Sequence, residues 1–372
     1  MDRIKWVDNL KGFILLLVCI GHVHFTTGMM YQVSSMCAAF RMTTFFFLSG
    51  YLFSVRKHKS ISSYTKSKTK SLLIPYICLS AVFLFFDMRL YDVSLIPYHE
   101  FTKYPILAFL GVPDIISSSM EYLYMNLVSI FISGTSVPIT TPLWFVNVLF
   151  WTSICFYIVH HITPTEAKKK KICILIYAII CLSIAWICNK GHYFLPLNFH
   201  VVCAATFYFS MGYLAKDLIN KHLNTMPIKY LLLMLIIIGP IYLYGINVNG
   251  AISLYTNSLG GKFYGLIIAS LSGIAGVVVA FILLSRIPGT SAIGGIFRNL
   301  ARNALIFLAV HYWVINTGDI VFHEINKDPL YKYAIFIAAL LISFLSFPIF
   351  RNKLYKLLGK EKISMKEALS IK

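Results

Sequence analysis

The fold is decided by the stretch KGFILLLVCIGH, residues Lys11–His22, which is almost wholly apolar between a lysine and a histidine. Continued to about residue 30, it is long enough to cross a bilayer, which takes roughly 20 residues of helix. On a helix Lys11 and His22 share one face and lie roughly 16 Å apart along the axis. Ionisable groups inside a bilayer are costly and commonly functional. We therefore predict one substrate path, with Lys11 at an interface and His22 near mid-membrane.

A structural role for His22 is the alternative, because a histidine in a membrane helix can simply hydrogen-bond a neighbouring helix. His24 stands two positions further on and points away from His22 on a helix. We expect His24 to be interfacial or structural.

The composition around this stretch is that of an integral membrane protein. Of the 372 residues 58% are hydrophobic and 13% are charged, and the mean hydropathy is +0.74. A soluble core cannot bury so much apolar sequence. Lys and Arg number 33 against 14 Asp and Glu. Because the basic residues gather in short loops between apolar runs, the excess indicates membrane topology and excludes a nucleic-acid partner.

Hydropathy predicts an all-α bundle of ten transmembrane helices. With both termini in the cytoplasm, most Lys and Arg residues fall on the cytoplasmic side, as the positive-inside rule requires. We expect one transmembrane domain over residues 1–355 and a basic cytoplasmic tail over 356–372. The predicted spans are 10–30, 36–55, 71–90, 143–162, 171–188, 200–216, 229–247, 262–285, 300–322 and 333–350.

The eight cysteines lie in or beside apolar runs and lack the spacing of a metal site or a disulfide framework. Within apolar helices a free cysteine behaves as a small hydrophobic residue. We therefore expect no metal site and no permanently bound cofactor.

The richest cationic loop between spans covers residues 56–70 and ends with Lys66, Lys68 and Lys70. Such a loop can fix topology and contact anionic lipid headgroups. Lysine also binds phosphate as a point charge, so the loop can equally hold a phosphorylated cytosolic ligand. Both interpretations stay open at this stage.

The segment 91–142 is too long and polar for a tight loop, and its prolines break it too often for a span. Two amphipathic pieces, near 101–111 and 121–132, are expected to lie on the outer membrane surface. A long insertion of this kind predicts a lid or an acceptor groove, and the alternative is a cap over the bundle. The segment carries the carboxylates Asp92, Glu100, Asp114 and Glu121.

Polar side chains enter two of the later predicted spans. Asn147 follows Trp144 in an apolar helix, where a buried amide needs a partner and either joins helices or contacts a ligand. Arg302 and His311 repeat the order of a basic interfacial residue followed by a buried histidine, and Tyr312 follows directly. We predict Trp144, Asn147, His311 and Tyr312 as substrate contacts.

Several short motifs resemble the acyltransferase 3 family of integral membrane O-acyltransferases. WVDNLKG at 6–12 leading to GH at 21–22 is similar to the family's first helix, whose signature is a basic residue, ten residues and a histidine. Lys11 and His22 fill that signature. FFFLSGYLF at 45–53, LLIPY at 72–76, PLWF at 142–145 and HY at 311–312 match later motifs in order. The LIPY and PLWF motifs look closest to the fucose 4-O-acetylase-like branch.

The sequence also departs from the family. Lys11 stands where relatives often have arginine, and Lys66, Lys68 and Lys70 replace an arginine cluster before the third span. Lysine cannot make the bidentate phosphate contact of arginine. The resemblance covers residues 3–350, and its phosphate contacts would therefore differ in detail here.

The resemblance implies transfer of an acetyl group from acetyl-CoA to a sugar hydroxyl of an envelope glycan or a lipid-linked saccharide in the bacterial cytoplasmic (inner) membrane. His22 would be the general base, since imidazole suits proton abstraction at neutral pH. The phosphates of coenzyme A would lie near Lys11, Lys66, Lys68 and Lys70. Direct transfer and an acetyl-histidine relay both remain open.

Two other classes of protein fit the same residues. A transporter or flippase for a glycan or small anion also needs many spans, buried histidine and a basic mouth. Such proteins commonly carry inverted repeats with broken helices in matching halves, and the sequence shows none. A non-catalytic membrane partner of a polysaccharide assembly complex is the third hypothesis.

Overall fold

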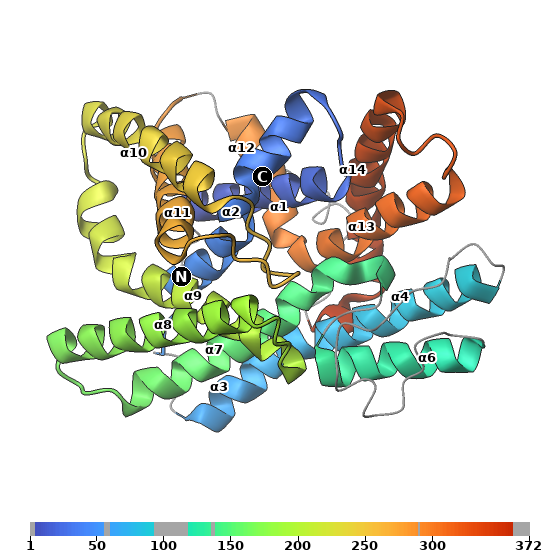
Figure 1. The fold of residues 1–372 in the computed structure, drawn as a ribbon, viewed down its shortest axis with the longest axis horizontal. Coiled ribbons are helices and arrows are strands. Elements are labelled where there is room, and N and C mark those ends of the chain that lie inside the picture. Colours follow the sequence, from blue (N-terminus) through green and yellow to red (C-terminus); the bar gives the residue numbers. More distant parts are fainter. Residues whose placement is uncertain (1–3, 56–59, 93–117, 135–137, 289–290, 360–372) are drawn as a thin grey trace.

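The computed structural model describes residues 4–55, 60–92, 118–134, 138–288 and 291–359, and these form an all-helical molecule (Figure 1). Within this part of the chain no β-strand occurs, and Ser253 and Ser258 form one isolated bridge. The basic run 56–59, the predicted amphipathic piece at 101–111 with Glu100 and Asp114 beside it, and the tail from residue 360 lie outside the described residues.

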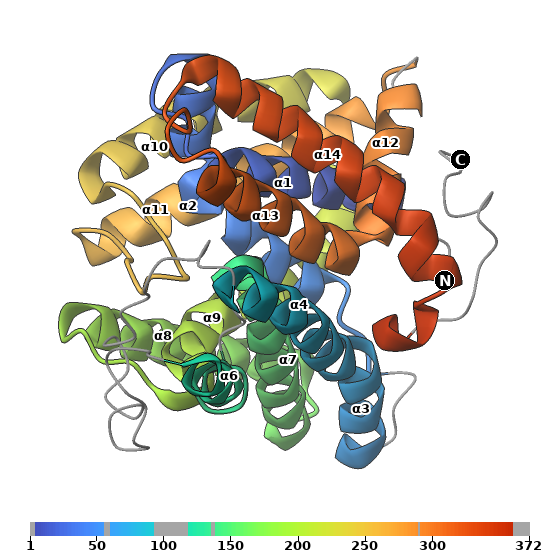
Figure 2. The same ribbon diagram turned by 90° about the vertical axis from the view of Figure 1, so that its right-hand side faces the viewer.

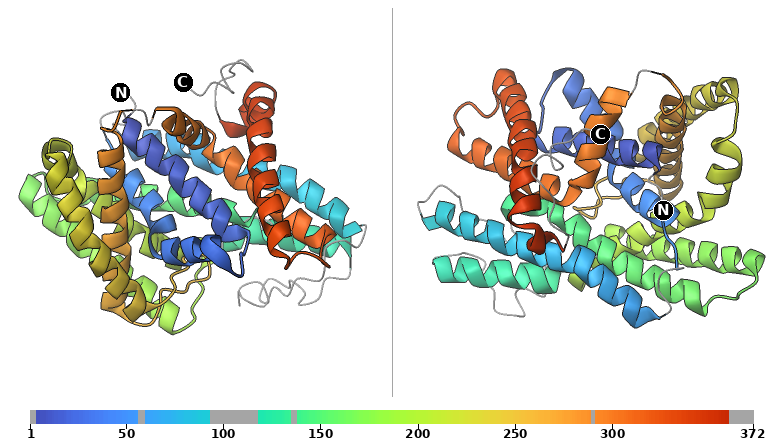
Figure 3. Two further views of the ribbon diagram at one scale, coloured as in Figure 1. Left: turned by 90° about the horizontal axis from the view of Figure 1, so that it is seen from above. Right: turned by 180° about the vertical axis from the view of Figure 1, so that it is seen from behind.

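Helix α1 (Lys5–His22) lies in the middle of one half of the molecule (Figure 3). Its first turn carries Asp8, whose charge suits the positive end of the helix dipole. Buried residues occur all round the helix, as expected for a helix enclosed by others. Its neighbours are α2 (Gly28–Tyr51), α11 (Phe263–Leu284), α12 (Ser291–Arg302) and α13 (Ala304–Val321).

The end of α1 differs from the predicted first span. The helix stops at His22, whereas the prediction continued to residue 30, and α2 already begins at Gly28. The backbone explains the break, because His24 and Gly28 have φ of 54° and 78° and cannot continue a helix. His22 is therefore the last residue of a helix beside a tight turn, and α2 returns along α1.

The contact between α2 and α9 (Phe199–Leu218) depends on two glycines. A Cβ atom on Gly50 would lie 1.8 Å from the Phe209 carbonyl oxygen, and one on Gly212 would lie 1.9 Å from the Phe47 carbonyl oxygen. Small residues permit such close backbone approach between membrane helices. Any larger residue at either position would force the two helices apart.

The remaining helices lie below α1 and α2 in Figure 1, except α10 at the left and α14 at the right. They are α3 (Ile61–Lys68), α4 (Ile74–Asp92), α6 (Ser119–Val128), α7 (Trp144–Ile162), α8 (Ala167–Lys190), α10 (Ile228–Asn249) and α14 (Pro329–Asn352). Short helical turns are η1 (Thr69–Leu73), η2 (Ser129–Ser133), η3 (Pro138–Leu143), η4 (Pro196–Asn198), η5 (Ile219–Leu223) and η6 (Tyr355–Leu358).

The segment predicted as an outer insertion packs against α4. Helix α6 lies beside α4 in Figure 2, and the Tyr122 hydroxyl donates a hydrogen bond to the buried Asp87 carboxylate. The amide of Asn126 donates to the Tyr122 carbonyl at 2.9 Å. The contact between Tyr122 and Asp87 fastens α6 to α4, whereas the Asn126 bond stays within α6 and satisfies a buried amide.

Seven helices among the described residues are long and apolar enough to cross a membrane, so the protein is a multi-pass membrane protein. Each of the ten predicted spans contains a helix. Three of these helices, α1, α2 and α9, are not apolar enough to be counted among the seven. In α1, Lys5, Asp8 and Lys11 lower the hydropathy. The ten-span count and the cytoplasmic termini stay predictions. The seven helices lie within 61–88, 141–162, 167–190, 228–249, 263–284, 304–321 and 329–352.

Candidate active site

A cavity of about 310 Å³ lies beside the end of α1, and we name it the His22 cavity. Helix α1 contributes Val18, Gly21 and His22, and His24 follows from the turn. The other walls come from α2, from the start of α7, from the connection between α10 and α11, and from α13. These further lining residues are Ala38, Arg41, Met42, Thr43, Thr141, Pro142, Trp144, Ile252, Ser253, Leu254, Tyr255, Thr256, Leu308 and Tyr312.

The predicted residues His22, His311 and Tyr312 come together here. The ring of His22 lies 4.8 Å from the ring of Tyr312 and 5.6 Å from that of His311, measured between centroids. His311 is fully buried and stacks on Phe307 at 4.8 Å and 8°. The structure therefore places His311 and Tyr312 against His22, although they are nearly 300 positions away in the chain.

The tautomer of His311 follows from its surroundings. Its Nδ1 lies 2.5 Å from the Phe307 carbonyl oxygen, and a carbonyl only accepts hydrogen bonds, so Nδ1 carries the proton. Its Nε2 is buried and has no hydrogen-bond partner among the described residues. The buried ring is thus held in one orientation against His22 from the side of α13.

Arg41 is the residue of this cavity that the sequence interpretation missed. It is the only charged residue of the predicted span 36–55, and intramembrane charges are functional candidates by default. From α2 its Nη1 donates to the Leu17 carbonyl of α1 at 3.2 Å. Gly21 makes room for it, because a Cβ atom there would lie 1.9 Å from this nitrogen. A guanidinium group therefore stands in the same cavity as His22.

The connection between α10 and α11 covers the cavity with residues 252–256, a segment that the sequence interpretation also missed. Asn249 anchors this cover, since its Nδ2 donates to the Leu259 carbonyl at 3.0 Å and its Oδ1 accepts from the Lys262 amide at 3.2 Å. Predicted Trp144 lines the cavity and packs on Tyr255 of the cover, with centroids 5.8 Å apart. The cluster of Gly, Asn and Ser residues at 249–261 marks the turn in the sequence.

The predicted acceptor segment 91–142 contributes less to the cavity than expected. Among its described residues only Thr141 and Pro142 line the cavity. Glu121 lies instead in the first turn of α6, where its backbone amide donates to the Ser118 hydroxyl. Of the carboxylates that we expected at an acceptor groove, Glu121 is thus not in this wall, and Glu100 and Asp114 lie outside the described residues.

Asn147 does not line the cavity. Its Nδ2 donates to the Gly134 carbonyl at 3.1 Å, and Nδ2 of Asn198 donates to the same oxygen at 3.2 Å. The two amides join α7 and η4 to the end of η2. Of the two roles open from the sequence, the structure shows the one that joins helical segments.

A second cavity, of about 560 Å³, lies toward the other end of α1, and we name it the Lys11 cavity. Lys11 and Lys68 line it, and the Nζ of Lys68 lies 5.3 Å from the Tyr64 ring centroid. The π-helical turn η1 contributes Ser71, and such turns are frequent at functional sites. The hydroxyls facing this cavity are those of Ser49, Ser54, Ser67, Ser71 and Ser153, besides the Tyr64 phenol.

Lys66 and Lys70 do not join the other two predicted lysines. Lys66 lines a separate surface depression with Ile61, and Lys70 is exposed. Helix geometry explains the difference. Each residue turns the helix by about 100°, so side chains two positions apart lie on nearly opposite faces. Lys68 therefore faces inward, whereas its neighbours Lys66 and Lys70 face outward.

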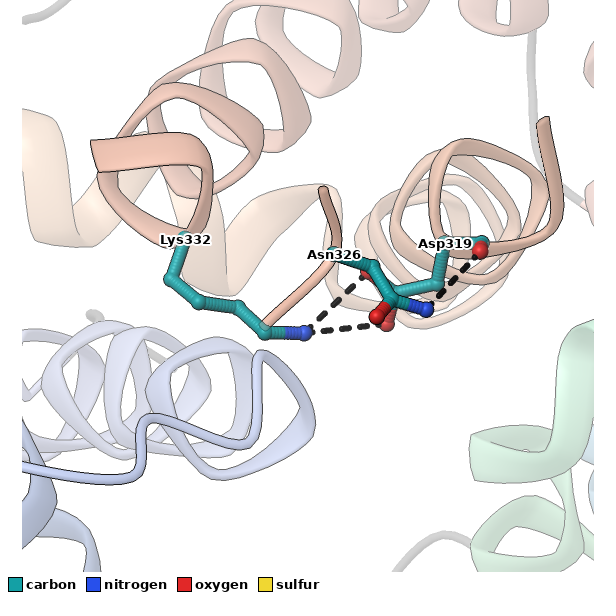
Figure 4. Close-up of polar contacts among 3 residues, drawn as sticks. All are labelled: Asp319, Asn326 and Lys332. Atoms are coloured by element: carbon teal, nitrogen blue, oxygen red, sulfur yellow. Dashed lines mark hydrogen bonds and ion pairs between the residues drawn. The ribbon is translucent and has the colours of Figure 1, made fainter. Parts of the chain in front are cut away.

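An ion pair fixes the α13–α14 hairpin next to the His22 cavity (Figure 4). The Nζ of Lys332 lies 3.2 and 3.3 Å from the two carboxylate oxygens of Asp319, and Asn326 donates to the Asp319 carbonyl at 3.2 Å. Asp319 lies two helical turns beyond Tyr312 on α13. Phe25, just after His22, packs on Tyr333 of α14 with centroids 5.2 Å apart.

The fold and the two cavities define the class of the protein. A central helix carries a cation at one cavity and a histidine at the other, inside a helical membrane bundle, an arrangement that suits a membrane-embedded enzyme. Within the described part of the chain no cluster of three His, Cys, Asp or Glu side chains is placed to hold a metal ion.

The chain belongs to the acyltransferase 3 family, because the model of this family, described as an acyltransferase domain, matches residues 4–356. No curated protein and no solved structure matches the chain. The match confirms the family indicated by the motifs, and the protein is accordingly a membrane acyltransferase.

Proposed function

We propose that the protein transfers an acetyl group from cytoplasmic acetyl-CoA to a sugar hydroxyl of an envelope polysaccharide or its lipid-linked precursor, in the bacterial cytoplasmic membrane. The observation that carries this proposal is the pair of cavities at the two ends of α1, one with Lys11 and Lys68 and one with His22. The motifs LIPY and PLWF look closest to the fucose 4-O-acetylase-like branch of the family, a likeness that does not fix the acceptor sugar of this chain.

The donor binds in the Lys11 cavity. Coenzyme A carries several phosphates, and the two ammonium groups supply positive charge for them, while the Ser67 hydroxyl in the same wall adds a hydrogen-bond donor. Its long flexible arm then follows α1 toward His22, over roughly 16 Å of helix. The open cavity suits a large donor head, whereas the acetyl end reaches the enclosed part of the bundle.

His22 acts as the general base in the transfer step. The imidazole takes the proton of the sugar hydroxyl while the oxygen attacks the thioester carbonyl carbon. The C–O bond forms, the C–S bond breaks, and the thiolate of coenzyme A takes up the proton from the imidazolium. Enclosure by residues 252–256 limits attack by water on the thioester. An acetyl-histidine relay would use the same residue as nucleophile.

The test is transfer of label. The purified protein in lipid nanodiscs, given acetyl-CoA labelled in the acetyl group and envelope oligosaccharides, should release one thiol for each acetyl ester formed. In sealed vesicles a transporter or flippase would instead move its cargo without forming an ester. Label that stays in the donor with every acceptor contradicts the proposal.

The orientation of the two cavities is tested by cysteine labelling in a background without the native cysteines. We expect a cysteine at Ser118, the exposed N-cap of α6, to react with an impermeant reagent from outside the cell. A cysteine at exposed Ser67, in the wall of the Lys11 cavity, should react only from the cytoplasm. Reversed accessibility would place the donor side outside the cell and contradict the proposal.

A further inference from the structure

We propose that the His22 cavity binds an anionic sugar and that Arg41 recognises its carboxylate or phosphate. This inference rests on the proposed function, because it names the class of acceptor for the same site. The acceptor is thus an acidic monosaccharide unit, and a neutral sugar is the poorer substrate.

The first support is that most N–H donors of the Arg41 guanidinium have no partner among the described residues. A guanidinium has five N–H donors, and the structure shows one hydrogen bond from it, to the Leu17 carbonyl. No carboxylate among the described residues pairs with it. An uncompensated charge within a membrane bundle is costly, and an anionic ligand offsets that cost through a bidentate contact.

The second support is the charge of the whole wall. None of the described residues that line the cavity is acidic, although Arg41 and two histidines are present. Asp319 lies on the same helix as Tyr312, but its carboxylate forms an ion pair with Lys332 (Figure 4). A site for neutral sugars commonly offers carboxylates as acceptors of hydroxyl hydrogen bonds. This wall instead offers a cation.

The third support is the size and shape of the space. A volume of about 310 Å³ is at the lower end for small-molecule sites and matches a single sugar unit. Trp144 and Tyr255 supply flat apolar surfaces for a sugar ring, and Ser253 supplies a hydroxyl. An anion held at Arg41 therefore places the remaining hydroxyls of the same ring in the cavity that His22 lines.

The experiment measures binding without the donor, so that it does not depend on acetyl transfer. The full-length protein in nanodiscs of zwitterionic lipid is titrated with methyl β-glucuronide, glucose 6-phosphate and methyl β-glucoside. We expect at least one of the two anionic sugars to bind about tenfold more tightly than the glucoside, equivalent to about 1.4 kcal/mol. Preference for the glucuronide assigns a carboxylate, and preference for the phosphate assigns a phosphosugar.

Variants connect this preference to Arg41. Arg41→Gln should remove it, and Arg41→Lys should keep only part of it, because lysine lacks the planar fork. Gly21→Ala displaces the guanidinium without removing its charge and should also weaken anion binding. Arg286→Gln is the matched control, since Arg286 is also part-buried and donates to carbonyls, at Leu223 and Met226, but lines neither cavity.

Three results would overturn the inference. One is equal binding of all three sugars by the unaltered protein, and another is an anion preference that survives in Arg41→Gln. The third is that Arg41→Gln lowers kcat equally for acidic and neutral acceptors while binding stays unchanged, which would make Arg41 a group that stabilises the reacting oxyanion. Failure of acetyl transfer with intact anion binding would instead contradict the proposed reaction.

Discussion

The two cavities along α1 hold their cations in different ways. In the Lys11 cavity two lysines present flexible ammonium groups among serine hydroxyls. In the His22 cavity one arginine is tied to the Leu17 carbonyl, and the cover at 252–256 closes over it. Flexible point charges suit a donor with several phosphates, whereas a fixed fork suits the choice of one acceptor. On the proposed function, this difference predicts that the choice of acceptor is made at the His22 end of α1.

The largest effect is expected at His22. His22→Ala removes the proposed general base, and acetyl transfer should fall by about 100-fold or more, measured as kcat/KM in nanodiscs. His222→Ala, on the exposed turn η5, is the matched control and should leave activity unchanged. Normal transfer by the His22 variant would show that His22 is not the general base. The two cavities would then no longer differ in the chemistry that we assign to them.

The ion pair beside the His22 cavity should affect stability next most strongly. Asp319→Asn leaves the buried Lys332 ammonium uncompensated, and we expect a loss of about 2 kcal/mol in the free energy of unfolding. The matched control is Asp217→Asn, which breaks an exposed pair with Lys171 and should cost about 0–1 kcal/mol. Equal losses from both variants, measured by denaturant titration in detergent, would show that burial of the pair contributes nothing.

The Lys11 cavity should respond through donor binding. Lys68→Ala is expected to raise the KM for acetyl-CoA roughly tenfold with little change in kcat, because a contact shared by ground state and transition state is lost. Lys66→Ala, two residues away on the opposite helix face, is its matched control. A similar rise in both variants would mean that the loop acts through general surface charge.

The smallest expected effect is that of salt. Raising ionic strength screens charges in open, solvent-filled sites more than charges in enclosed ones. We therefore expect the KM for acetyl-CoA to rise about 2–5-fold between low and high salt, while the KM for the acceptor changes less. Steady-state kinetics with each substrate varied in turn would measure both. An acceptor KM that rises more steeply would reverse the assignment of the cavities.

The sequence predicted the helical fold and the central role of α1 well, because apolar runs and the 3.6-residue period are local properties. It selected His311 and Tyr312 as site residues from the repeated order of a basic residue and a buried histidine and from the HY motif of the family, but it did not predict their contact with His22. The end of α1 was misplaced because the short turn at 23–27 joins two apolar helices, and hydropathy averaged over a window hides such a break.

Other features depend on packing that no local pattern contains. Arg41 reaches the cavity only because Gly21 leaves space on the neighbouring helix, and the cover at 252–256 is more than 200 residues from His22 in the chain. The outward orientation of Lys66 and Lys70 was available from helix geometry, since alternate residues cannot share a face. Their grouping with Lys68 followed from charge alone and neglected that geometry.

The close contact of Gly50 with α9 has a consequence for the order in which the protein is made. At roughly 5–20 residues per second, the ribosome needs about 8–30 s to proceed from Gly50 to Gly212. Until then the backbone of α2 at Gly50 is not covered by α9, and glycine has no side chain to cover it. Phe209 arrives with α9 and completes the wall that Ser49 and Leu52 begin. A nascent chain therefore carries Lys11 and His22 early, but it acquires the complete wall of the Lys11 cavity only after more than half of its synthesis.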